Sequence, residues 1–215
     1  MIPPTVDYFE ALDRAITRYP YDLRRAEALL EEAGFSRGRD GFFQSAADGR
    51  LMPEIKTIAA SQNEAEMSVL ASGWRQAGFD AQELITSPVQ AQDSQLRATF
   101  RTMHLNGGPL GERAVAGQLT TARIPKPENR WTGSNRGAWS NPDYDRHAEA
   151  IDTTLDRAAR TQHVIEAVRI YSEDLPAISL YFQLTVVANF AGLRGVREAA
   201  PDGSVAWNIH EWDFR

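Results

Sequence analysis

The sequence of 215 residues contains no cysteine. This absence excludes disulfides, thiolate nucleophiles, iron–sulfur clusters and thiolate zinc sites, although it does not fix the compartment. Long hydrophobic runs are also missing, because the longest apolar stretches, around 175–182 and 186–193, have only the length of a strand. A membrane-spanning helix needs about 18 or more consecutive apolar residues. We therefore expect that the chain does not span a membrane.

Positive charge is scarce as well. Lys and Arg number 23 against 29 Asp and Glu, which leaves a formal net charge of -6. This acidic balance lacks the electrostatic footprint of a nucleic-acid-binding protein, and no nucleic-acid partner is expected. The first residues, Met1 to Pro4, show neither the basic nor the apolar region of a signal peptide. Either the protein is cytoplasmic or the chain is not a whole gene product.

Motifs that carry catalysis or hold a cofactor are missing too. No phosphate-binding P-loop is present, and the glycine-rich segment 106–111 lacks the spacing of a dinucleotide loop. The segment 133–137 fails the Gly-x-Ser-x-Gly pattern of a hydrolase, because its serine directly follows the first glycine. The four histidines show no metal-binding spacing. We therefore expect no enzyme, no cofactor and no metal site.

Local sequence signals predict a helix before residue 54 and an alternation of strands and helices over residues 54–105. A first helix begins at the N-cap Asp22 and ends at Gly34, and a second, at about 63–77, ends at Gly78 in the same way. Strands are predicted at 54–60, 81–86 and 99–105, with a further helix at 90–98. This alternation is typical of an α/β unit with parallel strand pairing.

The rest of the chain begins with a long irregular stretch, residues 106–141. The length of this stretch predicts that it is functional or mobile. A short helix interrupts it. The predicted elements from there on are helices at 112–121 and 142–154, a helix that Asp156 caps, and a strand at 177–182.

Two tryptophans in the irregular stretch are the first candidates for a binding site. Trp131 and Trp139 lie beside Arg130, Asn135 and Arg136. Aromatic rings offer apolar area and the polar neighbours offer directed hydrogen bonds, as in the wall of a ligand site. The alternative is that the rings only hold the loop against the core.

Three segments of the chain resemble a known family. Residues 19–35 (YPYDLRRAEALLEEAGF) are similar to the tyrosine–aspartate and "Lys-Ala-x-x-Leu-Leu-x-x-Ala-Gly" segment of family 5 extracellular solute-binding proteins of ABC transporters. Residues 139–145 (WSNPDYD), followed by 156–160 (DRAAR), and residues 173–182 (EDLPAISLYF) resemble later segments of the same family. The family comprises periplasmic binders of dipeptides, oligopeptides and nickel.

The resemblance covers only the C-terminal part of such proteins. It implies a lobe of the type II periplasmic-binding-protein kind: an α/β fold with a central, mixed but mostly parallel sheet and flanking helices. Residues 1–185 would form this lobe, and residues 186–215 would be a tail that returns to a missing first lobe. The chain would then be a fragment or a natural truncation of a periplasmic protein, and the missing lobe and signal peptide would explain its bare N-terminus.

The implied function is capture of a peptide or other small polar solute in a cleft between lobes, for delivery to an ABC permease. We expect Trp139, Asn106, Gly107 and Arg136, with Trp131, to line this lobe's wall of the cleft. Peptide binders of the family commonly carry an aspartate for the peptide ammonium where this chain has Asn106. An uncharged amide compensates an ammonium poorly, which favours blocked peptides, sugars or other polar solutes unless a different acid takes the role.

A protein of a different class is the alternative. Trp207, Trp212 and Phe214 form an aromatic tail that would expose apolar surface if it does not dock. The chain would then be a stand-alone interaction module that reuses the lobe, and self-association of the isolated lobe is possible. A hydrolase has no motif in its favour.

Overall fold

The structure is a computed structural model that describes residues 1–183, 186–199 and 203–214. It divides into two compact units, each with a hydrophobic core of its own. The sheet unit comprises residues 19–107 and 125–136. The helical unit comprises residues 1–18, 108–124 and 137 to the end of the chain.

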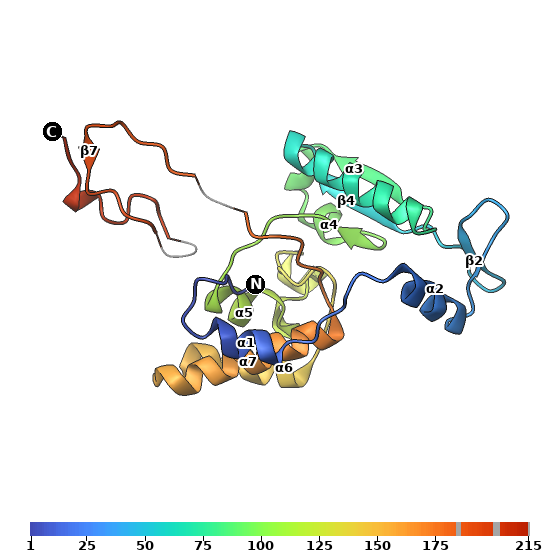
Figure 1. The fold of residues 1–215 in the computed structure, drawn as a ribbon, viewed down its shortest axis with the longest axis horizontal. Helices are drawn as coiled ribbons and strands as arrows, with labels where there is room; N and C mark the ends of the chain where they lie inside the picture. Colours follow the sequence, from blue (N-terminus) through green and yellow to red (C-terminus); the bar gives the residue numbers. More distant parts are fainter. Residues whose placement is uncertain (184–185, 200–202, 215) are drawn as a thin grey trace. The chain divides into compact units, whose positions relative to one another are not determined.

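A three-stranded parallel sheet forms the centre of the sheet unit, in the order β5-β4-β6 (Figure 1). Its strands are β4 (Glu54–Ile58), β5 (Gln82–Thr86) and β6 (Met103–His104). Helix α3 (Ser61–Gln76) connects β4 to β5 and buries Met67 and Ala71 completely against the sheet. This confirms the predicted α/β class and the parallel pairing. The predicted strand 99–105 is wrong in extent, because only β6 pairs with β4.

Glycines end two helices of the sheet unit. Helix α2 (Leu23–Glu32) begins at Asp22, whose carboxylate accepts the backbone N–H groups of Arg24 and Arg25. Gly34 after α2 and Gly78 after α3 adopt positive φ angles of 89° and 99°. This left-handed conformation is easy for glycine, so the predicted helix ends are confirmed. Helix α2 differs from α3 in burial, because none of the residues of α2 is buried.

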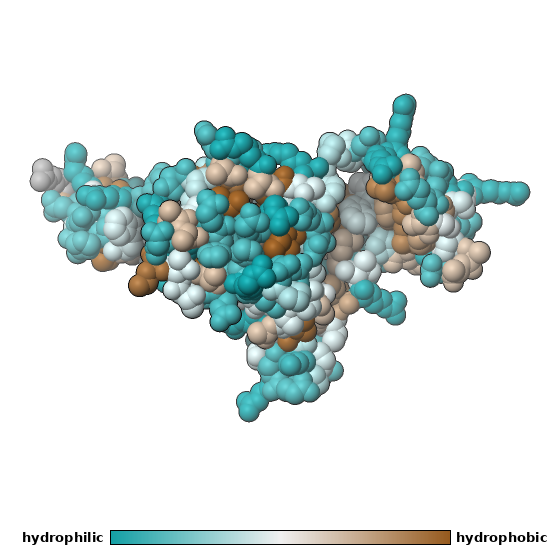
Figure 2. All heavy atoms as spheres, turned by 90° about the horizontal axis from the view of Figure 1, so that it is seen from below, coloured by the Kyte–Doolittle hydropathy of each residue, from teal (hydrophilic) through white to brown (hydrophobic). Residues whose placement is uncertain are grey.

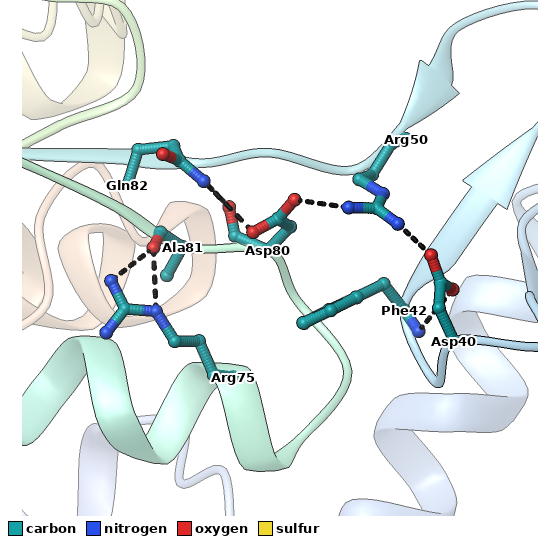
Figure 3. A network of polar contacts seen from close by, with 7 residues as sticks. All are labelled: Asp40, Phe42, Arg50, Arg75, Asp80, Ala81 and Gln82. Atoms are coloured by element: carbon teal, nitrogen blue, oxygen red, sulfur yellow. Dashed lines mark hydrogen bonds and ion pairs between the residues drawn. The ribbon is translucent and has the colours of Figure 1, made fainter.

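A small antiparallel sheet lies beside the parallel one and was not predicted. Its strands are β1 (Ser36–Arg37), β2 (Phe43–Ser45) and β3 (Gly49–Arg50). Arg50 links it to the segment before β5, because its guanidinium pairs with both Asp40 and Asp80 (Figure 3). Arg75 of α3 donates two hydrogen bonds, of 3.0 and 2.7 Å, to the carbonyl of Ala81 in the same network. These contacts fix the edge of the parallel sheet.

The remaining elements of the sheet unit are short. The predicted helix 90–98 is divided at Asp93, whose carboxylate accepts the backbone N–H groups of Gln95 and Leu96. The elements are η1 (Gln90–Gln92), α4 (Ser94–Ala98) and η3 (Pro127–Asn129).

The helical unit is built around α6 and α7, which pack against each other; α5 contacts both of them and α1 contacts α7 (Figure 1). Asn141 caps α6 and is followed by Pro142 at the first helical position, where the predicted helix 142–154 begins. The inner face of α7, which includes Val164 and Ala167, is buried. The elements are α1 (Phe9–Ala15), α5 (Glu112–Gln118), η2 (Thr121–Arg123), α6 (Pro142–Thr153) and α7 (Arg157–Asp174).

The C-terminal segment contains little regular structure among its described residues. Strands β7 (Leu193–Arg194) and β8 (Asp213–Phe214) pair antiparallel, with η4 (Ile209–Glu211) before β8. The predicted strand 177–182 is wrong: these residues are described, and they are exposed and pair with no strand. The Tyr171 hydroxyl instead donates to the Ala177 carbonyl, at 2.6 Å. The predicted boundary between residues 185 and 186 touches residues outside the described ones.

Candidate functional site

Two of the predicted site residues directly follow the end of a parallel strand. Asn106 and Gly107 come after β6 and are exposed, and the backbone N–H of Leu105 still donates to the Lys56 carbonyl of β4, at 2.8 Å. The carboxyl ends of parallel strands are where ligands bind in open α/β sheets. The position of both residues therefore suits their predicted role in binding.

Arg136 contacts the end of the same strand. Its Nη1 lies 3.4 Å from Nδ1 of His104, the last residue of β6. His104 and Lys56 are register partners in β6 and β4 and so point to one face of the sheet. Three predicted residues, Asn106, Gly107 and Arg136, thus belong to one end of one strand in the sheet unit.

Lys56 is almost wholly buried, with 3% of its surface exposed. Its ammonium donates to the carbonyl oxygens of Leu96 and, at 3.2 Å, Thr99, at the C-terminal end of α4. A cation suits this end of a helix, because the last carbonyls lack partners within the helix. Lys56 therefore holds α4 against the sheet.

Arg97 of α4 brings a third positive charge to this face. Its guanidinium donates to the Ala91 carbonyl and to the Ser94 hydroxyl, both at 3.3 Å. We call Lys56, Arg97 and Arg136 around His104 the cation cluster.

The cation cluster keeps His104 uncharged. Burial, followed by the positive charges of Arg136, Lys56 and Arg97, lowers the pKa of His104 to about 4. Burial and the charge of Arg97 also lower the pKa of Arg136. The neutral imidazole has one nitrogen that accepts, so His104 is a suitable acceptor for the Arg136 guanidinium at neutral pH.

Trp131 also belongs to the sheet unit, in the loop after η3. Its backbone and that of Arg130 adopt positive φ angles of 59° and 53°, which are unusual for residues with side chains. The Trp131 N–H donates to the Lys126 carbonyl at 3.1 Å, which closes the turn. The ring is partly buried. Its role in binding stays a prediction.

Trp139 belongs to the helical unit, and its contacts there are structural. The indole Nε1–H donates to the Asp174 carboxylate at 3.0 Å, and the ring packs edge-on against Tyr144 with centroids 4.8 Å apart. These contacts join the loop before α6 to the end of α7. They favour the interpretation that the ring holds the loop in place, and its role in binding stays a prediction.

The sequence patterns did not predict Lys56, Arg97 or His104 as site residues. A usable signal was present for Lys56, because it stands between the apolar and β-branched residues of a buried strand, Ile55 and Thr57. A lysine at such a position needs acceptors inside the fold. Arg97 carries no comparable signal, because an arginine on a short helix is ordinarily solvated.

Other chemistry is sparse in the described part of the chain. Within it, no three His, Asp or Glu side chains gather in a way that could hold a metal ion. His147 and His163 form a pair between α6 and α7, with their Nδ1 atoms 3.0 Å apart. Among the described residues, no helix has the length and apolar character needed to cross a membrane.

A shallow depression of about 590 Å³ lies on the helical unit, between the start of α1 and the start of α7. It contains none of the predicted site residues. The Arg157 guanidinium and the Asp7 carboxylate, which line it, pair with each other. The charges in this depression thus already have partners.

No family model matches the sequence, and no curated protein matches it. Solved structures do match. NikZ from Campylobacter jejuni in complex with Ni(L-His) is 21% identical, with a TM-score of 0.68 over 92% of this chain. An oligopeptide-binding protein from Thermus thermophilus, complexed with a pentapeptide, is 26% identical, with a TM-score of 0.67 over 78% of this chain. The oligopeptide-binding protein AppA from Bacillus subtilis, with a nonapeptide, is 15% identical, with a TM-score of 0.67 over 93%.

The chain has the fold of part of a family 5 solute-binding protein. It spans 40%, 31% and 39% of the lengths of these three structures. The resemblance found in the sequence and the type II periplasmic-binding-protein fold are thereby confirmed.

Proposed function

We propose that this chain is the C-terminal lobe of the solute-binding component of an ABC importer. It captures a peptide or another small polar solute between two lobes and delivers it to a membrane permease. The observation that carries the proposal is the structural match to NikZ, which extends over 92% of this chain at a TM-score of 0.68. The three structures named above hold a nickel complex or a peptide, which supports binding and transport rather than catalysis.

The exposed carboxyl end of the parallel sheet supports a binding site there. Asn106, Gly107 and Arg136 gather at β6, where a ligand would meet backbone groups, an amide and a guanidinium. Trp131, in the loop after η3 of the same unit, adds an aromatic ring to this wall. Trp139 belongs to the helical unit, and its role in binding stays a prediction. No nucleophile is needed, because a binding protein releases its ligand unchanged.

The exposed apolar residues near the C-terminus support a second lobe. Ile178, Tyr181, Val186 and Phe190 are 62%, 58%, 86% and 79% exposed. Figure 2 shows hydrophobic side chains in several separate patches on a face that is otherwise mostly hydrophilic. Exposed apolar surface marks contact with another protein surface. In the proposed protein, residues 1–185 form the C-terminal lobe, and residues 186–215 return to a first lobe that would cover these side chains. Such a protein works in the periplasm.

The proposal is tested by thermal unfolding of the purified chain in the presence of separate solutes. The panel contains a tripeptide, its blocked form, an oligosaccharide and Ni²⁺ with histidine. A ligand that binds only the folded chain raises its Tm, by an amount that grows with concentration. A concentration-dependent rise with one class of solute is expected. Failure of every class at millimolar concentration would contradict a binding role.

A stand-alone interaction module is the second candidate. Phe214 is 69% exposed and Trp207 is 50% exposed, although the Trp207 indole donates to the Glu198 carbonyl of its own segment, at 3.0 Å. This candidate predicts a stable complex with another protein and no response to any small solute. The panel above therefore separates the two functions.

A further inference from the structure

Arg136 differs from the other cations of the cation cluster in what its side chain contacts. Lys56 and Arg97 both donate to oxygen acceptors of α4 and its surroundings. The Arg136 guanidinium, by contrast, has a single hydrogen-bond partner among the described residues, Nδ1 of His104 at 3.4 Å. A guanidinium carries five N–H donors, so most of its capacity is unused by this part of the chain.

The charges around Arg136 are almost all positive. Among the described residues, no carboxylate forms an ion pair with Lys56, Arg97 or Arg136. Glu54 is the acid whose charge acts on the cluster, through Lys56. Arg136 is partly buried, so its charge is screened less than that of a surface arginine. An anion bound at Arg136 would supply the counter-charge that the described part of the chain does not.

From this geometry we infer that Arg136 binds a carboxylate of the solute, so that the protein takes anionic rather than cationic solutes. This inference rests on the proposed function and names the class of ligand for the same site. A guanidinium matches a planar carboxylate with two parallel hydrogen bonds. The strand end beside Arg136 carries the uncharged Asn106 and Gly107, which leaves the carboxylate as the compensating charge.

The positive cluster also acts against the opposite class of ligand. An ammonium at the end of β6 would be repelled by the charge of Arg136 and, through the fold, by that of the buried Lys56, and would find only the uncharged amide of Asn106. Like charges at a binding site cost affinity and exclude the wrong partner. Selection for anions therefore comes from repulsion of cations as well as from the hydrogen bonds of Arg136.

Two probes of equal length test this inference. N-acetyl-trialanine carries a carboxylate and no ammonium, and trialanine amide carries an ammonium and no carboxylate. Titration calorimetry on the purified chain should give an affinity at least about 10-fold higher for N-acetyl-trialanine, the effect of a charge-assisted hydrogen-bond pair. Arg136→Gln should abolish this preference. Arg101→Gln removes the same charge from an exposed position before β6 and should leave the preference intact.

The ring signals of His104 in NMR spectra provide a second readout. A carboxylate on Arg136 neutralises the nearest positive charge, so saturation with N-acetyl-trialanine should raise the pKa of His104. Trialanine amide should leave this pKa unchanged. Circular dichroism of Arg136→Gln checks that the variant folds, and Arg136→Lys, which keeps the charge but not the planar fork, should keep only part of the preference.

The outcomes separate this inference from the proposed function. Equal affinity for the two probes, or a preference that Arg136→Gln retains, overturns the inference while binding itself stands. Binding of another solute of the panel but of neither probe also overturns the inference alone. Failure of every solute and both probes overturns the inference together with the proposed function.

Discussion

At the scale of single residues, Tyr144 illustrates how one polar atom is accommodated in the core of the helical unit. Its side chain has no exposed surface, and its hydroxyl donates to the Val115 carbonyl at 2.6 Å. Burial also raises the pKa of Tyr144, because the phenolate would lose its hydration. The hydroxyl therefore stays protonated and joins α6 to α5.

Tyr144→Phe should lower the free energy of unfolding by about 1 kcal/mol, because it leaves a buried carbonyl without its donor. Urea denaturation measures this change. Tyr21→Phe is the matched control, because Tyr21 is 88% exposed and its removal should change stability little. Equal stability of Tyr144→Phe and the parent chain would contradict the role assigned to this hydrogen bond.

His104 predicts how stability depends on pH. Its pKa is about 4 in the folded chain and about 6.5 in an unfolded one. Between these values the unfolded chain holds a proton that the folded chain does not, so stability falls as the pH is lowered from about 6.5 to 4. The loss amounts to at most about 3 kcal/mol and stops below pH 4, where both states are protonated.

Urea denaturation at a series of pH values measures this effect. His104→Gln should flatten the curve between pH 6.5 and 4. Burial and the charge of His163 also lower the pKa of His147, which makes stability fall in the same direction. Because His147 is present in both chains, the difference between the two curves isolates His104. A curve that His104→Gln does not alter would show that His104 does not sit among the positive charges described above.

At the scale of the elements, two glycines with the same conformation differ in their surroundings. Gly34 has φ of 89° and open space where a Cβ would stand, whereas at Gly78, with φ of 99°, a Cβ would lie 2.8 Å from the Phe43 ring. Gly34→Ala should cost about 1 kcal/mol, because alanine is strained in the left-handed conformation. Gly78→Ala should cost clearly more, about 2–4 kcal/mol, because the Phe43 ring must also move.

Thermal unfolding of the two variants tests this pair. Both glycines end a helix with a positive φ, so the backbone strain of alanine is similar in the two variants. The difference between the two losses of stability therefore reports the contact of the new Cβ with the Phe43 ring. Equal losses at Gly34 and Gly78 would contradict the packing of Phe43 against the end of α3.

The helices were predictable because their signals are local. Asp22, Asn141 and Asp156 cap helices that each begin one residue later, and the buried positions repeat with the helical period. Strands depend on partners elsewhere in the chain. The segment 99–105 therefore keeps only the two residues that pair with β4, and the segment 177–182 forms no strand at all. The two-residue strands β1 and β3 are too short to show an alternation of polar and apolar residues.

The site could be predicted only in part for the same reason. Asn106 and Gly107 were proposed from the family resemblance, and Arg136 from its place beside two tryptophans in a polar loop. Their role in binding stays a prediction. The contact between Arg136 and His104 joins residues 32 positions apart and depends on the fold. Trp139 had two possible roles in the sequence, and only its bond to Asp174, on another helix, favours one of them.

At the scale of the whole molecule, the exposed apolar residues of the C-terminal segment predict self-association of the isolated chain. Val186 and Phe190 are 86% and 79% exposed, and surface of this kind is removed from water by association. Sedimentation velocity should detect dimers or larger species at micromolar concentration. Replacement of both residues by serine should shift the population to monomer without a loss of stability, because neither side chain is buried. A parent chain that stays monomeric would contradict this prediction.

The central claim is that the chain binds a small solute at the carboxyl end of its parallel sheet. Backbone chemical-shift mapping by NMR, with N-acetyl-trialanine and the other solutes of the panel added to the chain labelled with ¹⁵N, tests this claim most directly. We expect the largest shifts at the amides of Asn106, Gly107 and Arg136, with saturation at millimolar concentration. Shifts confined to the depression between α1 and α7, or no shifts with any solute, would contradict the claim.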